Sequence, residues 1–341
     1  MKLTIVRRPR LIATQESFMS PEQRDGILEL LDAGVSIPDL VHWKSMLRER
    51  GPEKGDQLLD LEQLRLKSMD EHGIDMQVLS LNSPGVQMFA SDKAVGIAAT
   101  ANDRLAAAIA RHPTRFAGLA TVAPQNPQAA AKEIDRAINS LKLKGLVINS
   151  HTNGEYLDEK KYWPILESAE ACGAPIFIHP RVLAGEAVRP FLPYSLETAM
   201  WGFHTETGLH AIRLICSGVF ERFPNLKIVL GHMGESIPFW LWRLDHVAGN
   251  GRIRPVLPLT PAAYFRRNFM ITTSGMHWDA ALRFCIEVMG ADKIMFAIEY
   301  PHRSSEIAVK FIDKANISAE DRIKISSGNA EKLLGIDPAH A

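Results

Sequence analysis

Short apolar runs recur along the chain, separated by segments whose apolar residues follow a helical spacing. The clearest run is Ile176-Phe177-Ile178, which is followed directly by His179 and Pro180. An unbroken apolar run of this length is typical of a buried parallel strand, because both faces of such a strand are covered. Eight runs predict strands at residues 10–15, 76–81, 116–122, 145–149, 176–179, 227–232, 268–273 and 293–299.

Helical spacing fills the intervals between these strands. It predicts helices at residues 58–72, 92–112, 127–141, 159–171, 206–223, 237–247, 279–289, 304–315 and 319–334. Alternating strands and helices favour a parallel sheet, and eight such units favour a closed (β/α)8 barrel of the TIM type. No GxGxxG or Walker sequence follows a strand, which argues against a nucleotide-binding fold. We therefore predict one α/β domain over residues 1–341, with insertions at about 18–57, 181–205 and 249–266 near the barrel mouth.

Composition and charge exclude several classes of protein. Hydrophobic residues make up 46% of the 341 residues, charged residues 23%, and the formal net charge is zero. Nothing in this balance favours binding to nucleic acid or to an anionic membrane. The chain has neither a run of about 18 apolar residues nor an apolar segment after its basic start, so we expect no membrane span and no secretory signal. Cys172, Cys216 and Cys285 are far apart, which predicts free thiols in the reducing cytoplasm.

Polar side chains follow the predicted strands at their carboxyl ends. The mouth of a barrel collects the side chains of several strand ends into one pocket, where the chemistry of this fold is found. Several imidazoles and a carboxylate at these positions therefore predict a polar active site. The candidates are Gln15, Ser17, Asn82, Asn149, His151, His179, His232, Ser274, His277, Glu299, His302 and Arg303.

One candidate pair stands at a strand-to-helix turn. In Gly231-His232-Met233-Gly234-Glu235, the acid follows the histidine by three residues. At this spacing Glu235 could orient or charge His232, as a general acid or base requires, or it could simply be an acid at a helix start. Arg243, on the following helix, could bind a substrate carboxylate with two hydrogen bonds or pair with a neighbouring acid.

Several longer strings resemble one family. The chain is similar to the decarboxylase branch of the amidohydrolase superfamily, which contains 5-carboxyvanillate, γ-resorcylate and 2,3-dihydroxybenzoate decarboxylases. The resemblance covers nearly the whole chain. It rests on residues 12–14 (IAT), 83–87 (SPGVQ), 121–125 (TVAPQ), 148–152 (INSHT), 156–159 (YLDE), 178–180 (IHP), 206–208 (ETG), 231–235 (GHMGE), 240–241 (WL) with 243–245 (RLD), and 329–332 (NAEK).

This resemblance implies a divalent metal ion, usually Mn or Zn, at Gln15, His179 and Glu299. Only His179 has the identity that the family leads us to expect, since Gln15 stands in place of a Glu and Glu299 in place of an Asp. The three side chains carry a charge of about −1 rather than −2, and an amide oxygen is a weaker ligand than a carboxylate. His277 and His302 could supply replacement ligands.

The resemblance also assigns roles in catalysis. The main hypothesis is the non-oxidative decarboxylation of a small ortho-hydroxylated aromatic carboxylate, with Glu299 as proton donor to the ring carbon. His232 with Glu235 would polarise the phenol, and Arg50 with Arg243 would hold the carboxylate. The remaining residues predicted to bind substrate are Asn82, His151, His277, His302 and Arg303.

Two other functions remain open on the same scaffold. A hydratase or a lactone or ester hydrolase would use His277 and His302 to activate water. A metal-free binding protein or degenerate enzyme is suggested by Gln15, because the loss of one charged ligand could abolish metal binding. The resemblance further implies a homodimer or homotetramer formed through helices of the outer ring.

Overall fold

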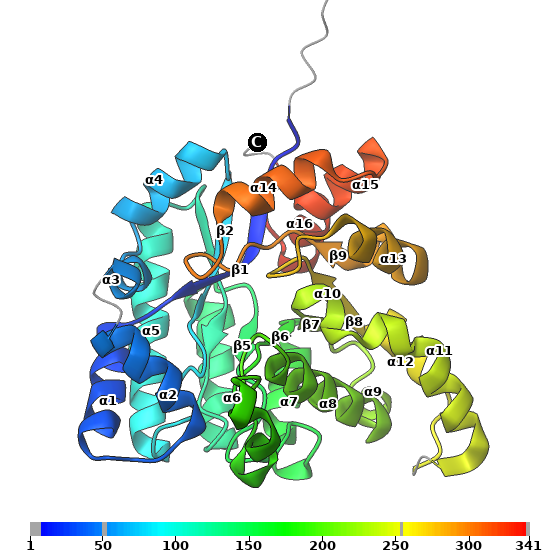
Figure 1. The fold of residues 1–341 in the computed structure, drawn as a ribbon, viewed down its shortest axis with the longest axis horizontal. Helices are drawn as coiled ribbons and strands as arrows, with labels where there is room; N and C mark the ends of the chain where they lie inside the picture. Colours follow the sequence, from blue (N-terminus) through cyan, green and yellow to red (C-terminus); the bar gives the residue numbers. More distant parts are fainter. Residues whose placement is uncertain (1–7, 50–52, 253–254, 339–341) are drawn as a thin grey trace, which may run out of the picture.

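The computed structural model describes residues 8–49, 53–252 and 255–338 (Figure 1). Its strands pair in parallel throughout, in the order β1-β2-β3 and then β4-β5-β6-β7-β8-β9. The strands are β1 (Ile12–Phe18), β2 (Met76–Leu81), β3 (Phe116–Gly118), β4 (Ala120–Thr121), β5 (Leu146–Ile148), β6 (Ile176–Ile178), β7 (Ile228–Leu230), β8 (Phe269–Thr272) and β9 (Ile294–Met295).

The predicted third strand is divided into β3 and β4. Leu119, between them, donates its backbone N–H to Leu79 at 2.8 Å, and Ala120 donates to Gly145 at 2.8 Å. β3 and β4 therefore form one interrupted strand that connects the two sheets, and the nine labelled strands occupy eight positions in the barrel. The ladder is not continuous between β9 and β1, but Thr14 donates its backbone N–H to Phe296 at 3.0 Å across this junction. The (β/α)8 arrangement predicted from the alternating pattern is confirmed.

Helices surround these strands in Figure 1. Their order follows the predicted one, but several predicted helices are divided. Asp60 breaks the first of them, because its carboxylate accepts the backbone N–H groups of Glu62 at 2.5 Å and Leu64 at 2.7 Å and so starts a new helix. The helices that follow strands are α4 (Gln63–His72), α5 (Ser91–Arg111), α6 (Pro127–Asp135), α7 (Trp163–Ala171), α8 (Gly202–Cys216), α9 (Val219–Arg222), α11 (Ile237–Val247), α13 (Asp279–Met289), α14 (Ser305–Lys314), α15 (Ala319–Ile323) and α16 (Asn329–Leu334).

The predicted insertions are partly helical. Residues 18–57 contain α1 (Pro21–Asp32), α2 (Pro38–Lys44), a π turn (Ser45–Glu49) and the start of α3 (Glu53–Leu59). The second insertion contains a 3-10 segment (Gly185–Tyr194), and the third contains the start of α12 (Pro261–Asn268). Within the ranges that the structure describes, no helix has the length and apolar character needed to cross a bilayer.

Apolar side chains fill both sides of the strand ring. Val147, Phe177 and Val229 belong to the cluster inside the barrel, whereas Ile176 and Ile178 pack outward against the helices. Both faces of β6 are therefore buried, as its unbroken apolar sequence predicts. Because the strand ends at Ile178, His179 emerges at the carboxyl edge of the barrel.

The strand β1 continues past the predicted end at residue 15 to Phe18, so Gln15 lies in its middle and not at its carboxyl end. The register shifts between Ala13 and Glu16. Glu16 accepts the backbone N–H groups of Ile298 at 2.9 Å and Tyr300 at 2.6 Å. Burial raises the pKa of Glu16 to about 7 despite these bonds. Through its bonds to Ile298 and Tyr300, the carboxyl group of Glu16 fixes the segment that carries Glu299.

Candidate active site

The turn after β7 has an unusual backbone. Residues 232–236 all have positive φ angles, between 49° and 81°, in the segment labelled α10 (His232–Glu235) in Figure 1. Such angles are rare for residues other than glycine and cost about 1–3 kcal/mol each, which is why they concentrate at functional sites. At Gly234 a Cβ atom would lie 2.8 Å from Cγ2 of Ile271, so no other residue fits. The sequence predicted a strand-to-helix turn here, and the structure has a left-handed turn.

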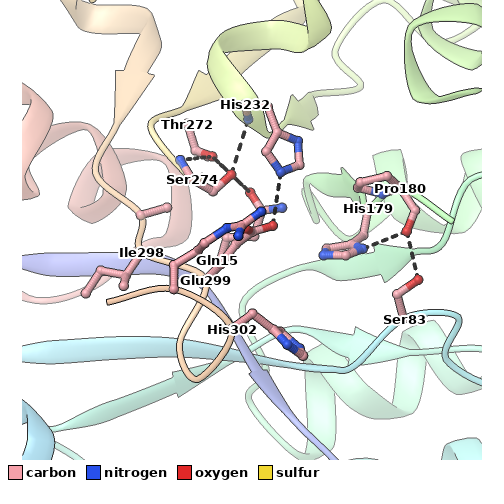
Figure 2. Close-up of polar contacts among 12 residues, drawn as sticks. Gln15, Ser83, His179, Pro180, His232, Thr272, Ser274, Ile298, Glu299 and His302 are labelled. Atoms are coloured by element: carbon pink, nitrogen blue, oxygen red, sulfur yellow. Dashed lines mark hydrogen bonds and ion pairs between the residues drawn. The ribbon is translucent and has the colours of Figure 1, made fainter. Parts of the chain in front are cut away.

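This turn holds His232 between two carboxylates. Its Nδ1 lies 2.8 Å from Oε1 of Glu235. Its Nε2 lies 3.0 Å from Oε1 of Glu299, a contact shown in Figure 2. Burial alone would lower the pKa of His232, but the two negative charges outweigh it and raise the pKa well above its ordinary value. His232 is therefore an imidazolium at neutral pH, and both ring nitrogens donate hydrogen bonds.

Glu299 is held as a carboxylate by the opposite effect. Burial raises its pKa, but the charge and hydrogen bond of His232 lower it to about 2. Its other oxygen faces Nε of Arg303 at 3.5 Å. The backbone of Glu299 also lies in the left-handed region, with φ 74°. Two cations thus stabilise one buried carboxylate at the carboxyl end of β9.

His179 presents a free nitrogen to the same space. Its Nδ1 lies 2.9 Å from the carbonyl oxygen of Pro180, which can only accept, so Nδ1 carries the proton and Nε2 has a lone pair. Burial lowers the pKa of His179, so the ring is neutral. In Figure 2 the ring points toward Glu299. A backbone carbonyl that orients the far nitrogen is the usual arrangement for a metal-binding histidine.

Gln15 is fixed by two hydroxyl groups. Its Oε1 accepts hydrogen bonds from Oγ1 of Thr272 at 2.9 Å and Oγ of Ser274 at 3.1 Å. Ser274 Oγ in turn accepts the backbone N–H of His232 at 3.2 Å. The amide is thus tied to the turn that carries His232 (Figure 2). Thr272 was missed from the sequence because it lies inside the predicted strand 268–273.

The side chains around His179 offer a mixed set of donors to a divalent cation. Across residues 8–49, 53–252 and 255–338, no group of three or more His, Cys, Asp or Glu side chains could hold a metal ion. If the amide of Gln15 is counted as a ligand, three side chains are available. Gln15 offers a carbonyl oxygen, His179 an imidazole nitrogen and Glu299 a carboxylate, and divalent cations accept all three. The two hydroxyl bonds use both lone pairs of the Gln15 oxygen, so one of them must be given up when this oxygen binds a cation, and the three donors carry a charge of about −1. This set fits a cation that is held less tightly than by two carboxylates.

A pocket of about 480 Å³ opens at this edge of the barrel. Six of the predicted residues line it, namely Asn82, His179, His232, Glu299, His302 and Arg303. His302 Nε2 lies 2.7 Å from Oδ1 of Asn82. Sequence reasoning missed Asp39, His42, Trp43 and Met46, which line the pocket from the insertion at 18–57. No periodicity or motif marks these residues, because their position depends on long-range packing.

Two predicted binding residues lie elsewhere. The Nε2 of His151 donates to the carbonyl oxygen of Val182 at 2.9 Å, and His151 lines a second cavity of about 250 Å³. Burial and the charge of Arg181 lower the pKa of His151 to about 4. His277 has its Nε2 3.2 Å from the carbonyl oxygen of Ala297 and is not among the residues lining the main pocket. Both rings turn away from the pocket after their strands end. Their place at the carboxyl end of a strand predicted that they would face the pocket, but it does not determine the direction of the side chain.

Of the two predicted arginines, Arg243 is also outside this pocket. Arg243 is exposed on α11, with its guanidinium 5.8 Å from the ring centre of Trp240. It does not line the pocket of its own chain. Arg50 lies outside the described residues.

We predict that His232 remains protonated at pH 7.5, which long-range ¹H–¹⁵N spectra of the imidazoles can measure, with His232→Asn used for assignment. The substitution Glu235→Gln removes one of the two charges and should lower the pKa of His232 toward its ordinary value near 6.5. Because the pKa is raised in the folded state, this stabilisation is present at low and neutral pH and is lost as the pH rises through the raised pKa. Glu287→Gln, an exposed change on α13, serves as the control. A neutral His232 in the unaltered protein at pH 7.5 would contradict the assignment.

Comparisons with known proteins identify the family of this chain. The amidohydrolase family model matches residues 32–336. The γ-resorcylate decarboxylase of Polaromonas sp. is 36% identical, over 96% of this chain and 98% of the relative. The crystal structure of 5-carboxyvanillate decarboxylase from Sphingomonas paucimobilis has a TM-score of 0.93 and 44% identity, covering 97% of this chain and all of that one. The enzyme of the same name from Novosphingobium aromaticivorans, complexed with manganese and 4-hydroxy-3-methoxy-5-nitrobenzoic acid, has a TM-score of 0.93 and 38% identity, covering 96% of each chain. The chain therefore belongs to the amidohydrolase family, in its branch of aromatic-acid decarboxylases.

Proposed function

We propose that the protein is a carbon–carbon lyase that removes CO2, without oxidation, from an ortho-hydroxylated aromatic carboxylic acid. The observation that carries this proposal is the buried Glu235–His232–Glu299 chain, which stores a proton beside the pocket. Relatives that are 35–44% identical over nearly the full chain are named as decarboxylases of hydroxylated aromatic acids. The substrate proposed here is a small aromatic carboxylate of the same kind.

The proton for the ring carbon comes from the His232–Glu299 pair. The proton on Nε2 of His232 lies on the 3.0 Å hydrogen bond to Glu299, so Glu299 can receive it as it protonates the carbon that bears the carboxylate. The bond between that carbon and the carboxylate then breaks, CO2 leaves, and the bonding electrons restore the aromatic ring. Glu235 holds His232 in position, and its negative charge favours reprotonation of His232 by a solvent proton after each turnover.

The substrate carboxylate would bind at Arg303. This residue lines the pocket beside Glu299, and its planar guanidinium can bind a carboxylate with two hydrogen bonds. His302 and Asn82 lie on the same lining and offer further polar contacts. Arg50 and Arg243 are also proposed to bind the substrate carboxylate. Arg243 does not line the pocket of its own chain, so it would have to reach the pocket of a partner chain.

A divalent metal ion, such as the manganese bound by relatives, is proposed as the cofactor. Gln15 Oε1, His179 Nε2 and the Glu299 carboxylate would hold it, with His179 already oriented by Pro180. When bound, such an ion supplies a positive charge that stabilises the negative charge of a phenolate. The hydrolytic alternative gains no support, since His277, one of its two water-activating residues, bonds a backbone carbonyl.

CO2 release tests the proposed reaction. A panel of ortho-hydroxybenzoates, assayed with and without Mn or Zn, should include substrates that lose CO2. Glu299→Gln removes the proton carrier and should lower kcat by roughly 10²–10⁴-fold, the range for one general acid. Glu167→Gln, an exposed change on α7, should leave the rate unchanged. The absence of CO2 release from every member of the panel would refute the proposal.

Metal binding can be tested without activity. Gln15→Glu adds a negative charge to the donor set and should tighten Mn²⁺ binding at least about tenfold in isothermal titration calorimetry. Gln128→Glu, an exposed change on α6, makes the same charge difference away from the pocket and should have no effect. Equal affinities for the unaltered protein and Gln15→Glu would show that Gln15 is not a ligand.

We also propose a homo-oligomer that forms through α11. Phe239, Trp240 and Trp242 expose 76%, 49% and 75% of their surface on this one helix, more apolar surface than a monomer usually leaves in contact with water. Arg243 lies beside the ring of Trp240. A cytoplasmic location is proposed because Cys172, Cys216 and Cys285 are free thiols.

Light scattering tests the association. The unaltered protein should have at least twice the mass of one chain, and Trp242→Glu should lower that mass by placing a charge in the aromatic face. Ile307→Glu, a change at an exposed apolar residue of α14, is the matched control and should leave the mass unchanged. A monomeric mass for the unaltered protein would contradict the proposal.

A further inference from the structure

We infer that the pocket contains an apolar compartment that accepts a second ring, or an apolar group of similar size, attached to the reacting ring. The inference rests on the proposed function and narrows its substrate class. Most of the polar lining comes from strand ends, as described above. The two insertions add the polar residues Asp39, His42 and Thr198 and most of the apolar lining: Trp43 and Met46 from the first, and Val182, Ala199 and Phe203 from the second.

The apolar side of the pocket is held in place by a buried ion pair. Asp39 on α2 binds Nη2 of Arg181 at 2.5 Å, and both side chains are almost fully buried. Asp39 also accepts the backbone N–H of Val182 at 3.2 Å. The two insertions are therefore joined to each other directly beside His179. Because these bonds engage both oxygens of Asp39, we assign it to holding the wall and not to proton transfer.

Trp43, Met46 and Val182 are already packed before any ligand binds, whereas Phe203 is half-buried and Ala199 is exposed at the rim. Trp43 is 1% exposed and belongs to the main core, and Val182 packs with Leu183, Val188 and Phe203 in a small cluster of its own. A rigid apolar surface of this kind favours an apolar group of a ligand, since burying that group removes its surface from water without first ordering the protein.

The size of the pocket supports the same conclusion. A volume of about 480 Å³ lies in the range that encloses ligands of drug size, which is more than one substituted benzene ring requires. With the hydroxyl and carboxylate groups at His232, Glu299 and Arg303, a single ring would leave the compartment between the insertions unfilled. A biaryl ortho-hydroxy acid fills both parts.

The test compares each ortho-hydroxybenzoate with analogues that carry a phenyl group meta or para to the carboxylate. At least one phenyl analogue should have a kcat/KM about tenfold or more above its parent, since even one added methylene in an apolar pocket contributes 10-fold or more. Ala199→Trp places an indole ring at the rim of the compartment, where it should block a second ring and abolish this preference while the parent compound is still turned over. Ala187→Trp, an equally bulky change at an exposed residue of the same insertion that is outside the pocket lining, should preserve the preference.

The outcomes separate the two proposals. Turnover of the parent compounds with equal or lower kcat/KM for every phenyl analogue would overturn the second-ring compartment and leave the decarboxylase assignment standing. A phenyl preference that survives Ala199→Trp would also overturn it. Failure of parents and analogues alike to lose CO2 would refute the proposed function itself. Turnover of the parent by Ala199→Trp shows that this variant is folded.

Discussion

The positive charge of His232 is the interaction on which the pocket depends. It lies within hydrogen-bonding distance of Glu235 and Glu299, and the second oxygen of Glu235 is buried with no hydrogen-bond partner among the residues that the structure describes. Two buried carboxylates without this cation would each face a large desolvation cost. The left-handed turn at residues 232–236 is itself costly, and it is the backbone that lets His232 reach both partners.

Two further sets of bonds place Glu299 opposite this histidine. Glu16 receives the backbone N–H groups around residue 299 from the far side of β1, and Gln15, its neighbour on the pocket side, joins the Ser274 hydroxyl that binds the His232 backbone. Adjacent residues of one strand thus secure the two halves of the ion pair. Because side chains alternate along a strand, Glu16 can fix the backbone around Glu299 while Gln15 faces the pocket.

Much of this structure could be predicted from the sequence, because buried parallel strands leave unbroken apolar runs and the barrel topology places their ends together. The placing of Asn82, His179, His232 and Glu299 in one pocket follows from that rule alone. The rule fails where a side chain turns after its strand, as His151 does toward Val182. It is silent on the wall between the insertions, because the Asp39–Arg181 contact joins residues that are 142 positions apart.

The most direct test of the account is isotope labelling of the product. The account predicts that, in D2O, the ring carbon that loses the carboxylate gains one deuterium, while in H2¹⁸O the aromatic product gains no ¹⁸O. This result follows if the His232–Glu299 pair delivers a solvent-derived proton and only a carbon–carbon bond breaks. A product that contains ¹⁸O, or that retains its carboxylate, would contradict the account and indicate hydration or hydrolysis.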